Sequence, residues 1–410
     1  MQRRDFLKLA GTAGLGLISP AIGRAAQPEE DPGIFFVHVQ AVGGWEPTLL
    51  CDPKGSTNKS YAEDDILTAG KIKYAPKGAA WDTFFKTNAS RMVVLNGVDV
   101  QSNNHDAGRR HMASGRLGEG HPSAAAVIAG SQAPHLPIAL LSFGGYEETG
   151  GLVAPTREVD RARLAGIIYP DRLNPDDPKA GNYHSATTRA LIDLARRKRA
   201  ERRLADVQLP KIHGSMDTLL TARLGSDQLK RMEELLPTLT GQGEAARVEL
   251  AVAAYRAGVG IAANFSRGGF DTHSNHDAAH TDAMSKLLDL VNMIWAKVDA
   301  AGVAERTVML ISSDFGRTPT YNGNNGKDHW PISSMIVVSG LPGFQGNRMV
   351  GLTDDGHMPI LIDPVTLEPS ESGVRIRPEH IHRNLRDLIG VQPAIEQRYP
   401  LSPEVELQLF

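Results

Sequence analysis

The chain is poor in cysteine, in long apolar runs and in excess charge. Cys51 is the one cysteine among 410 residues, so no disulfide bond can form within the chain. No apolar stretch reaches the roughly 20 residues that span a bilayer, because the best candidate, residues 9–23, is short and rich in glycine. The formal net charge of −3 gives no reason to expect nucleic acid or an anionic membrane surface as a partner.

The N-terminal residues have the pattern of an export leader. A charged start, an apolar middle and small residues near Ala25 and Ala26 predict a signal peptide over residues 1–26. Arg3 and Arg4, followed by Asp-Phe-Leu-Lys, resemble the twin-arginine signal. This resemblance implies the twin-arginine translocase as a partner, export in the folded state, and a periplasmic or secreted protein, which fits a chain without disulfides. A retained N-terminal anchor is the alternative.

Short apolar, β-branched runs between glycine, proline or polar clusters predict buried strands. They cover residues 34–42, 91–98, 137–143, 259–265, 306–312 and 333–340. Helical patterns lie between several of them, most clearly over residues 276–301. Strands that alternate with helices predict an α/β fold with a mostly parallel sheet covered on both faces. Residues 27–410 are predicted to form one domain, with a charged helical insertion at about 151–245.

Polar side chains that can bind ligands follow several of these runs, where Gly or Asn turns begin. Ligands of open α/β sheets bind at the carboxyl ends of strands, so we expect these loops to converge on one pocket. The loops contain Glu46; Ser102, His105 and Asp106; Asp271, His273 and His276; and, within SSDFGRTPTYNGNNGKDHW (312–330), Asp314, Arg317, Asp328 and His329.

Imidazole and carboxylate groups together are typical ligands of zinc, whereas manganese, magnesium and calcium favour oxygen. We therefore predict a divalent metal, zinc first and the other three as alternatives, held by the acids and histidines of these loops. Two ions roughly 3.5–4 Å apart would suit phosphoryl or sulfuryl transfer, and Arg317 would clamp the non-bridging oxygens. The plain alternative is a solvated loop, with Asp271 as a helix N-terminal acid and His276 as a surface histidine.

Several motifs resemble the exported proteins of the DUF1501 family. They are GGWEPTLLCDP, SNNHDAGRRHMASGR, GGFDTHSNH and SDFGRTP…NGNNGKDHW, and the resemblance spans about residues 34–390. This family is grouped with the alkaline phosphatase superfamily, so the resemblance implies a three-layer α/β sandwich and a metal-dependent site that cleaves or transfers esters. Asp328-His329 matches the superfamily's adjacent Asp-His ligand pair. Asp271 and His273 resemble its Asp-spacer-His ligands, with a spacer of one residue instead of three.

Other positions depart from the superfamily's pattern or leave a role open. Glu46 stands where relatives carry aspartate at the end of the first strand. The resemblance implies a last histidine ligand downstream of the Asp-His pair, and His357 is the candidate for it. The nucleophile is open: Ser102 and His105 are both candidates, with Asp106 beside them, and His105 is alternatively a general acid.

The sequence thus predicts an exported metal-dependent hydrolase of phosphate or sulfate esters, acting on a small-molecule or polysaccharide ester. The expected metal ligands are Glu46, Asp271, His273, His276, Asp314, Asp328, His329 and His357. The alternative from another class is a non-catalytic, metal-stabilised cell-surface or polysaccharide-binding protein that kept the scaffold and lost the nucleophile. A phosphotransferase or mutase is less natural outside the cytoplasm, where phosphorylated metabolites are scarce.

Overall fold

The computed structural model describes residues 33–177, 179–236 and 239–410. These residues belong to one compact unit. The leader predicted at residues 1–26 lies outside the described residues, so its export role stays a prediction. In the described ranges, no helix is both long enough and apolar enough to cross a lipid bilayer.

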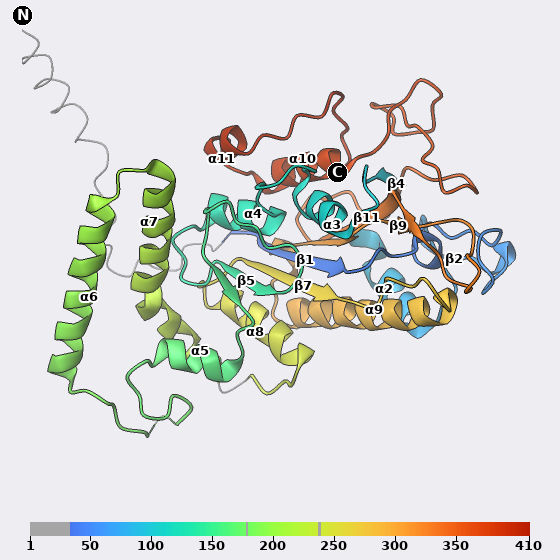
Figure 1. Ribbon diagram of the computed structural model, residues 1–410. Helices are drawn as coiled ribbons and strands as arrows, with labels where there is room; N and C mark the ends of the chain where they lie inside the picture. The colour runs from blue at the N-terminus through green and yellow to red at the C-terminus, as the bar shows by residue number, and fades with distance from the viewer. Residues whose placement is uncertain (1–32, 178, 237–238) are drawn as a thin grey trace, which may run out of the picture. The chain divides into compact units, whose positions relative to one another are not determined.

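An eight-stranded sheet forms the centre of the described fold (Figure 1). Its strand order is β12-β4-β11-β8-β1-β7-β5-β6. Neighbouring strands are parallel except at β11, which runs antiparallel to both β4 and β8. The strands are β1 (Phe35–Ala41), β4 (Met92–Asp99), β5 (Leu140–Phe143), β6 (Pro155–Arg157), β7 (Ala262–Arg267), β8 (Thr307–Ser313), β11 (Ile332–Ser339) and β12 (Arg348–Val350). The predicted mostly parallel α/β sheet is confirmed.

The direction of β11 follows from the chain that precedes it. Between β8 and β11 lies a small two-stranded ribbon of β9 (Gly316–Arg317) and β10 (His329–Trp330), which pair antiparallel. This ribbon turns the chain back on itself, so β11 returns beside β8 without a crossover helix. A further ribbon of β2 (Leu67–Ala69) and β3 (Ile72–Tyr74) lies outside the central sheet.

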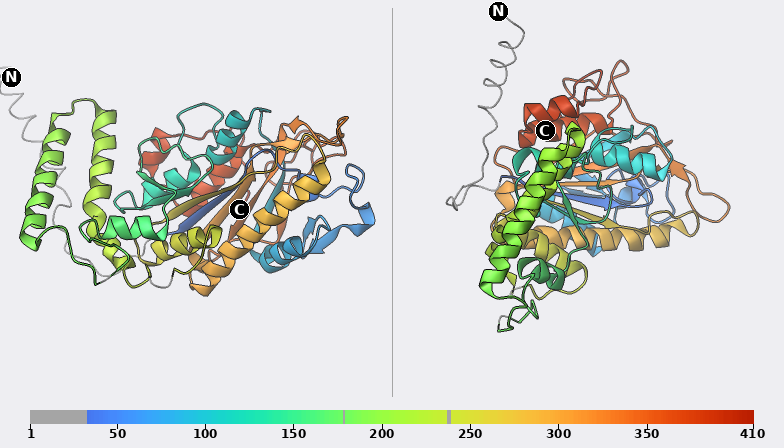
Figure 2. Two further views of the ribbon diagram at one scale, coloured as in Figure 1. Left: turned by 60° about the horizontal axis from the view of Figure 1, so that its bottom comes forward. Right: turned by 60° about the vertical axis from the view of Figure 1, so that its left-hand side comes forward.

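Helices cover both faces of the sheet and make it a three-layer sandwich (Figure 2). Odd-numbered residues of β1, such as Val37 and Val39, pack in one core with α2, α8 and α9. Phe36 of β1 and Leu310 of β8 pack in the other core with α3, α4 and α10. Both faces of β1 are therefore buried, and every residue of FFVHVQA is buried, the polar His38 and Gln40 included. The helices are α2 (Ala79–Asn88), α3 (His105–Ser114), α4 (Ala124–Gln132), α8 (Glu244–Arg256), α9 (His276–Ala300), α10 (Pro378–Ile389) and α11 (Pro393–Arg398).

The segment predicted as a helical insertion contains α5 (Arg161–Ile168), α6 (Ala186–Asp206) and α7 (Pro210–Leu224). In Figure 1, α6 and α7 lie side by side. The charged helix α6 has no buried residue, in agreement with a solvated helix face. The same segment also contributes β6, which pairs with β5 at the edge of the central sheet. Its limits as an insertion in one domain stay a prediction.

Two histidines are buried on the face of the sheet that α3, α4 and α10 cover. His38 of β1 contacts the Ser312 hydroxyl of β8 through Nε2 at 2.9 Å, and His382 of α10 donates from Nε2 to the Met112 carbonyl oxygen at 3.0 Å. Burial lowers the pKa of each imidazole to about 3. Because the unfolded chain protonates these groups near pH 6.5, it binds more protons than the folded chain between pH 6.5 and about 3. This difference makes the folded state less stable as the pH falls through that window.

We expect His38→Gln to weaken the acid sensitivity of the fold. Each such histidine lowers the free energy of unfolding by up to about 1.4 kcal/mol per pH unit below its unfolded pKa, and the variant removes one of them. Urea unfolding at pH 7.5 and pH 5.0 measures the difference. His135→Gln, at an exposed position, is the matched control and should keep the wild-type difference. If the free energy of unfolding of His38→Gln fell with pH as much as that of the wild type, His38 would not be a source of the acid sensitivity.

Candidate metal centre

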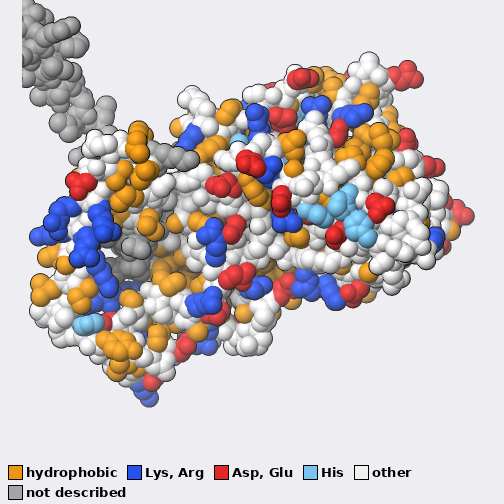
Figure 3. All heavy atoms as spheres, viewed as in Figure 1, with side chains coloured by type: hydrophobic (Ala, Val, Ile, Leu, Met, Phe, Trp, Pro, Cys, Tyr) orange, Lys and Arg blue, Asp and Glu red, His pale blue; other side chains and the backbone are white. Residues whose placement is uncertain are grey.

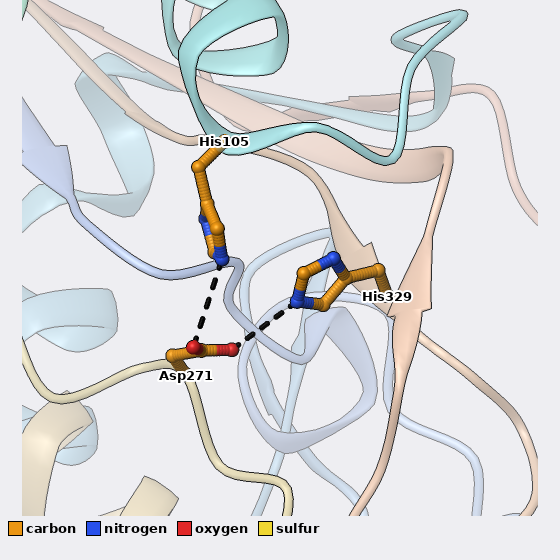
Figure 4. Close-up of side chains that lie close together, drawn as sticks. All are labelled: His105, Asp271 and His329. Carbon is orange, nitrogen blue, oxygen red and sulfur yellow. Dashed lines mark hydrogen bonds and ion pairs between the residues drawn. The ribbon is translucent and has the colours of Figure 1, made fainter.

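Histidine and aspartate side chains gather at the carboxyl end of the sheet, on the surface that Figure 3 shows. Asp271 and His273 lie on the loop between β7 and α9. His105 is the first residue of α3, and the side chain of Asn104 caps that helix by accepting from the Ala107 amide at 3.0 Å. His329 begins β10. The expected convergence of loops at strand ends therefore brings His105, Asp271 and His329 together (Figure 4).

Nitrogen and oxygen atoms of these residues form a tight group. The Asp271 Oδ1 atom lies 3.0 Å from His273 Nε2 and 3.2 Å from His329 Nε2. The two Nε2 atoms lie 3.1 Å from each other. His105 Nε2 approaches the other oxygen of Asp271 at 3.7 Å. We call His105, Asp271, His273 and His329 the open cluster.

Each imidazole of the open cluster contacts an oxygen acceptor through its other ring nitrogen, Nδ1. His105 Nδ1 lies 2.8 Å from Asp314 Oδ2, His273 Nδ1 lies 2.8 Å from Asp328 Oδ1, and His329 Nδ1 lies 2.8 Å from the carbonyl oxygen of Asn103. A carboxylate and a carbonyl have no hydrogen to donate. Each Nδ1 therefore carries the hydrogen, and in a neutral ring each Nε2 has a free lone pair.

With this tautomer, the facing lone pairs of the open cluster repel one another when no cation lies among them. The lone pairs of His273 and His329 face each other at 3.1 Å, and both face the Asp271 carboxylate. A proton on one imidazole relieves only the contacts of the nitrogen that carries it. A metal ion among these atoms relieves every contact, and histidine ligands of metals typically donate from their other nitrogen to a carboxylate or carbonyl, as here.

The spacing of the open cluster fits a zinc ion. Zinc–ligand bonds of about 2.0–2.1 Å with tetrahedral angles place neighbouring ligand atoms roughly 3.3–3.4 Å apart. The triangle of Asp271 Oδ1, His273 Nε2 and His329 Nε2 has sides of 3.0–3.2 Å, which calls for only a slight expansion. His105 forms a second, looser group with Asp271 and His329, whose ligand atoms all lie within 4.8 Å of one another.

Asp314 and Asp328 lie behind the imidazoles, although the sequence suggested both as direct ligands. Asp314 is fully buried, accepts from the Gly43 amide at 2.9 Å and from Arg109 Nε at 3.3 Å, and holds His105. Asp328 is exposed and holds His273. These placements give both carboxylates the position of groups that orient ligands.

Arg317 is fully buried and tethered, although the sequence suggested it as an anion clamp. Its Nε donates to the Gly44 carbonyl at 2.9 Å and its Nη1 to the Lys327 carbonyl at 3.0 Å. Its Nη2 donates to the Gly43 carbonyl and, at 2.7 Å, to Asp271 Oδ1. Burial alone would raise the pKa of Asp271, but the hydrogen bond and charge of Arg317 lower it to about 2. The guanidinium therefore keeps Asp271 ionised.

Glycine is required where the β1 loop meets this site. Gly43 has φ +121°, and a Cβ atom built there would lie 2.5 Å from the backbone nitrogen of Asp271. Any side chain would therefore push the β1 and β7 loops apart. The Gly-Gly turn of the first motif allows the close approach that brings Asp271 to the carbonyl groups around Arg317.

Glu46, His276 and His357 converge at a second place, which we call the interior cluster. All three are buried, and Glu46 contacts Lys327 Nζ at 3.1 Å. His276 Nε2 lies 3.8 Å from Glu46 Oε2, and His357 Nδ1 lies 3.9 Å from Glu46 Oε1. Burial would raise the pKa of Glu46, but the charges of Lys327, His357 and His276 lower it to about 2. Of the eight expected ligands, Asp271, His273 and His329 thus lie in the open cluster and Glu46, His276 and His357 in the interior cluster, whereas Asp314 and Asp328 stand behind imidazoles.

The remaining candidates do not contact the open cluster. Ser102 Oγ accepts from the Asn104 amide at 3.1 Å. Asp106 is exposed and lines, together with Arg109, a hollow of about 380 Å³. Sequence reasoning missed Arg109, which lies one helical turn after His105 and contacts Asp314, and Lys327, which precedes the Asp-His pair. The i, i+4 spacing on α3 was an available signal for Arg109, whereas no spacing rule pointed to Lys327.

Comparison with protein families gives one match. The family described as "Protein of unknown function (DUF1501)" matches residues 182–369, which confirms the predicted resemblance over that part of the chain. That range includes Asp271, His273, Asp328 and His329. No curated protein shows significant sequence similarity to the chain.

Solved structures show only a distant likeness. Ps i-CgsB has 8% identity and a TM-score of 0.41, covering 92% of this chain and 75% of that one. The lipoteichoic acid synthase LtaP from Listeria monocytogenes has 6% identity and a TM-score of 0.37, covering 94% and 78%. A putative sulfatase from Bacteroides thetaiotaomicron has 11% identity and a TM-score of 0.33, covering 92% and 76%.

We expect Asp328→Ala to weaken zinc binding by about 10–100-fold, because His273 loses the acceptor that fixes its orientation. Titration of the metal-free protein with zinc, followed by calorimetry, measures the change. Asp282→Ala removes an exposed carboxylate that pairs with Lys286 on α9 and should bind zinc as the wild type does. A loss as complete as that of His273→Ala would show instead that Asp328 binds the ion directly.

Proposed function

We propose that this protein is an exported hydrolase of phosphate or sulfate esters that depends on a divalent metal, with zinc as the first candidate. The observation that carries the proposal is the convergence of free Nε2 lone pairs on the ionised Asp271 carboxylate, with every Nδ1 held by an oxygen acceptor. His105, Asp271, His273 and His329 would hold the ion. The DUF1501 match and the resemblance of the motifs to the alkaline phosphatase superfamily agree with this reading.

The chain's own residues would prepare the site for an ester anion. A divalent ion bound there supplies Lewis-acid stabilisation of negative charge on a phosphoryl or sulfuryl oxygen. Asp314 and Asp328 orient two imidazoles and raise their basicity as ligands. Arg109 takes the role expected of Arg317, because its guanidinium contacts Asp314 and is still partly exposed beside the open cluster. It offers a cation for the non-bridging oxygens of the ester.

We further propose that the leader delivers the folded, metal-loaded chain through the twin-arginine translocase to the periplasm or the outside. The substrate would then be a small-molecule or polysaccharide ester. Mixed histidine and carboxylate donors also accept manganese, and magnesium and calcium stay weaker alternatives because imidazole dominates the donor set.

A specific observation favours a second candidate, the non-catalytic metal-stabilised binding protein. Among the described residues, no serine, threonine or cysteine side chain hydrogen-bonds to a donor of the open cluster. In this reading His105, the other candidate nucleophile, is used to hold the ion, so the chain would lack the side-chain nucleophile that the resemblance implies. Near-stoichiometric metal without turnover of any ester, together with loss of thermal stability on chelation, would favour this candidate.

We expect the purified protein to contain close to stoichiometric metal and His273→Ala/His329→Ala to contain almost none, because that variant removes two of the facing lone pairs. Elemental mass spectrometry measures the metal. The wild type should hydrolyse aryl phosphate or aryl sulfate esters, and the variant should not. His184→Ala, at an exposed histidine that pairs with Asp171 elsewhere, is the control. A wild type that binds no zinc or manganese after reloading would overturn the proposal.

We expect Arg109→Gln to raise KM for the ester by about 10–100-fold, since a charge-assisted hydrogen bond contributes roughly 1.5–3 kcal/mol. Metal content should stay near that of the wild type, because Arg109 does not belong to the open cluster. Steady-state kinetics with elemental analysis of the same samples checks both. Arg116→Gln changes an exposed arginine just beyond the same helix and should leave KM unchanged. An unchanged KM in Arg109→Gln would remove this residue from ester binding.

A further inference from the structure

The interior cluster already contains a positively charged side chain, that of Lys327. Lys327 Nζ lies 3.1 Å from Glu46 Oε2 and 3.1 Å from the carbonyl oxygen of Thr57, to both of which it donates. Both side chains of the ion pair are completely buried. The opposite oxygen of Glu46 accepts from the Thr48 hydroxyl at 2.6 Å. A buried ion pair needs such additional hydrogen bonds to offset the loss of water, and here they are present.

The groups around Lys327 are those that a metal ion would use. Glu46 offers a carboxylate oxygen, Thr57 a carbonyl oxygen, and His276 a buried Nε2 atom that has no hydrogen-bond partner and lies 3.8 Å from Glu46 Oε2. His357 does not offer a free nitrogen, because its Nδ1 contacts the Arg317 carbonyl and its Nε2 the Thr57 hydroxyl. Carboxylate, carbonyl and imidazole are ordinary ligands of a divalent cation.

We propose that the ammonium group of Lys327 occupies the cation position of the interior cluster, so that the protein binds a metal ion at the open cluster only. A divalent ion placed beside Glu46 would stand within a few ångströms of the ammonium and would be repelled by it. The carboxylate is already neutralised, and its oxygens are already in use. The expectation of two adjacent ions is therefore replaced by one ion and one lysine. This inference rests on the proposed metal-dependent function.

A lysine in this position also fixes the geometry of the open cluster. The carbonyl of Lys327 accepts from Arg317, and the same guanidinium holds Asp271. Through Glu46 and Thr57, the ammonium ties the 318–329 loop to the loops that follow β1. A resident charge keeps these loops in place whether or not metal is supplied, which a second ion would not do.

The test is the zinc content of Lys327→Ala after removal of metal and reloading. The wild type should bind about one zinc ion per chain, and Lys327→Ala about two, because Glu46 and His276 lose their internal cation and become free ligands. Lys327→Ala/Glu46→Gln should return to about one. Lys286→Ala, which removes an exposed lysine of α9, is the matched control and should resemble the wild type.

A folded Lys327→Ala that still binds one ion would overturn the inference and leave the proposed function standing. A wild type that binds no metal would overturn the proposed function itself. A second measurement needs no variant: zinc-loaded crystals of the wild type should give an anomalous scattering peak at the open cluster and none beside Glu46. A peak beside Glu46 would overturn the inference even if Lys327→Ala failed to fold.

Discussion

The buried guanidinium of Arg317 is the contact on which the site depends. An arginine cannot give up its charge inside a protein, so its N–H groups must find acceptors when water is excluded. Here the carbonyl groups of Gly43, Gly44 and Lys327 and the carboxylate of Asp271 surround it. These acceptors come from the ends of different strands. The Arg317 side chain therefore holds the loops together and fixes the position of Asp271, which His273 and His329 face.

The balance of charge explains why the two clusters differ. In the interior cluster the chain supplies both partners, Glu46 and Lys327, and the hydroxyl of Thr48 completes the hydrogen bonds of the carboxylate. In the open cluster Arg317 pairs with Asp271, but no cation of the chain lies between the free nitrogens of His273 and His329. Water and ions can reach the second arrangement because it is exposed. In the function proposed above, the chain fills the cation position that solvent cannot reach and leaves the accessible one for an ion.

Sequence reasoning predicted the scaffold better than the roles of individual side chains. The apolar runs placed β1, β4, β8 and β11 within one or two residues, because buried strands need continuous apolar residues. The rule that ligands meet at strand ends brought Asp271 and His329 together correctly. The rule could not say which carboxylate faces the Nε2 atoms of the histidines and which stands behind an imidazole. That distinction depends on rotamers and loop packing, as the buried Asp314 and the tethered Arg317 show.

The short motif Lys-Asp-His-Trp shows how closely packing constrains this loop. Lys327 points inward to Glu46, Asp328 holds His273, His329 joins the open cluster, and Trp330 donates from its indole to the His357 carbonyl at 2.9 Å. These four consecutive residues thus take part in four different contacts: an interior ion pair, a carboxylate that orients a histidine, the open cluster, and a hydrogen bond to a neighbouring loop. Deleting one residue would exchange these environments, placing a charged lysine or aspartate where no partner exists. The antiparallel pairing of His329 with Arg317 fixes the register against such a shift.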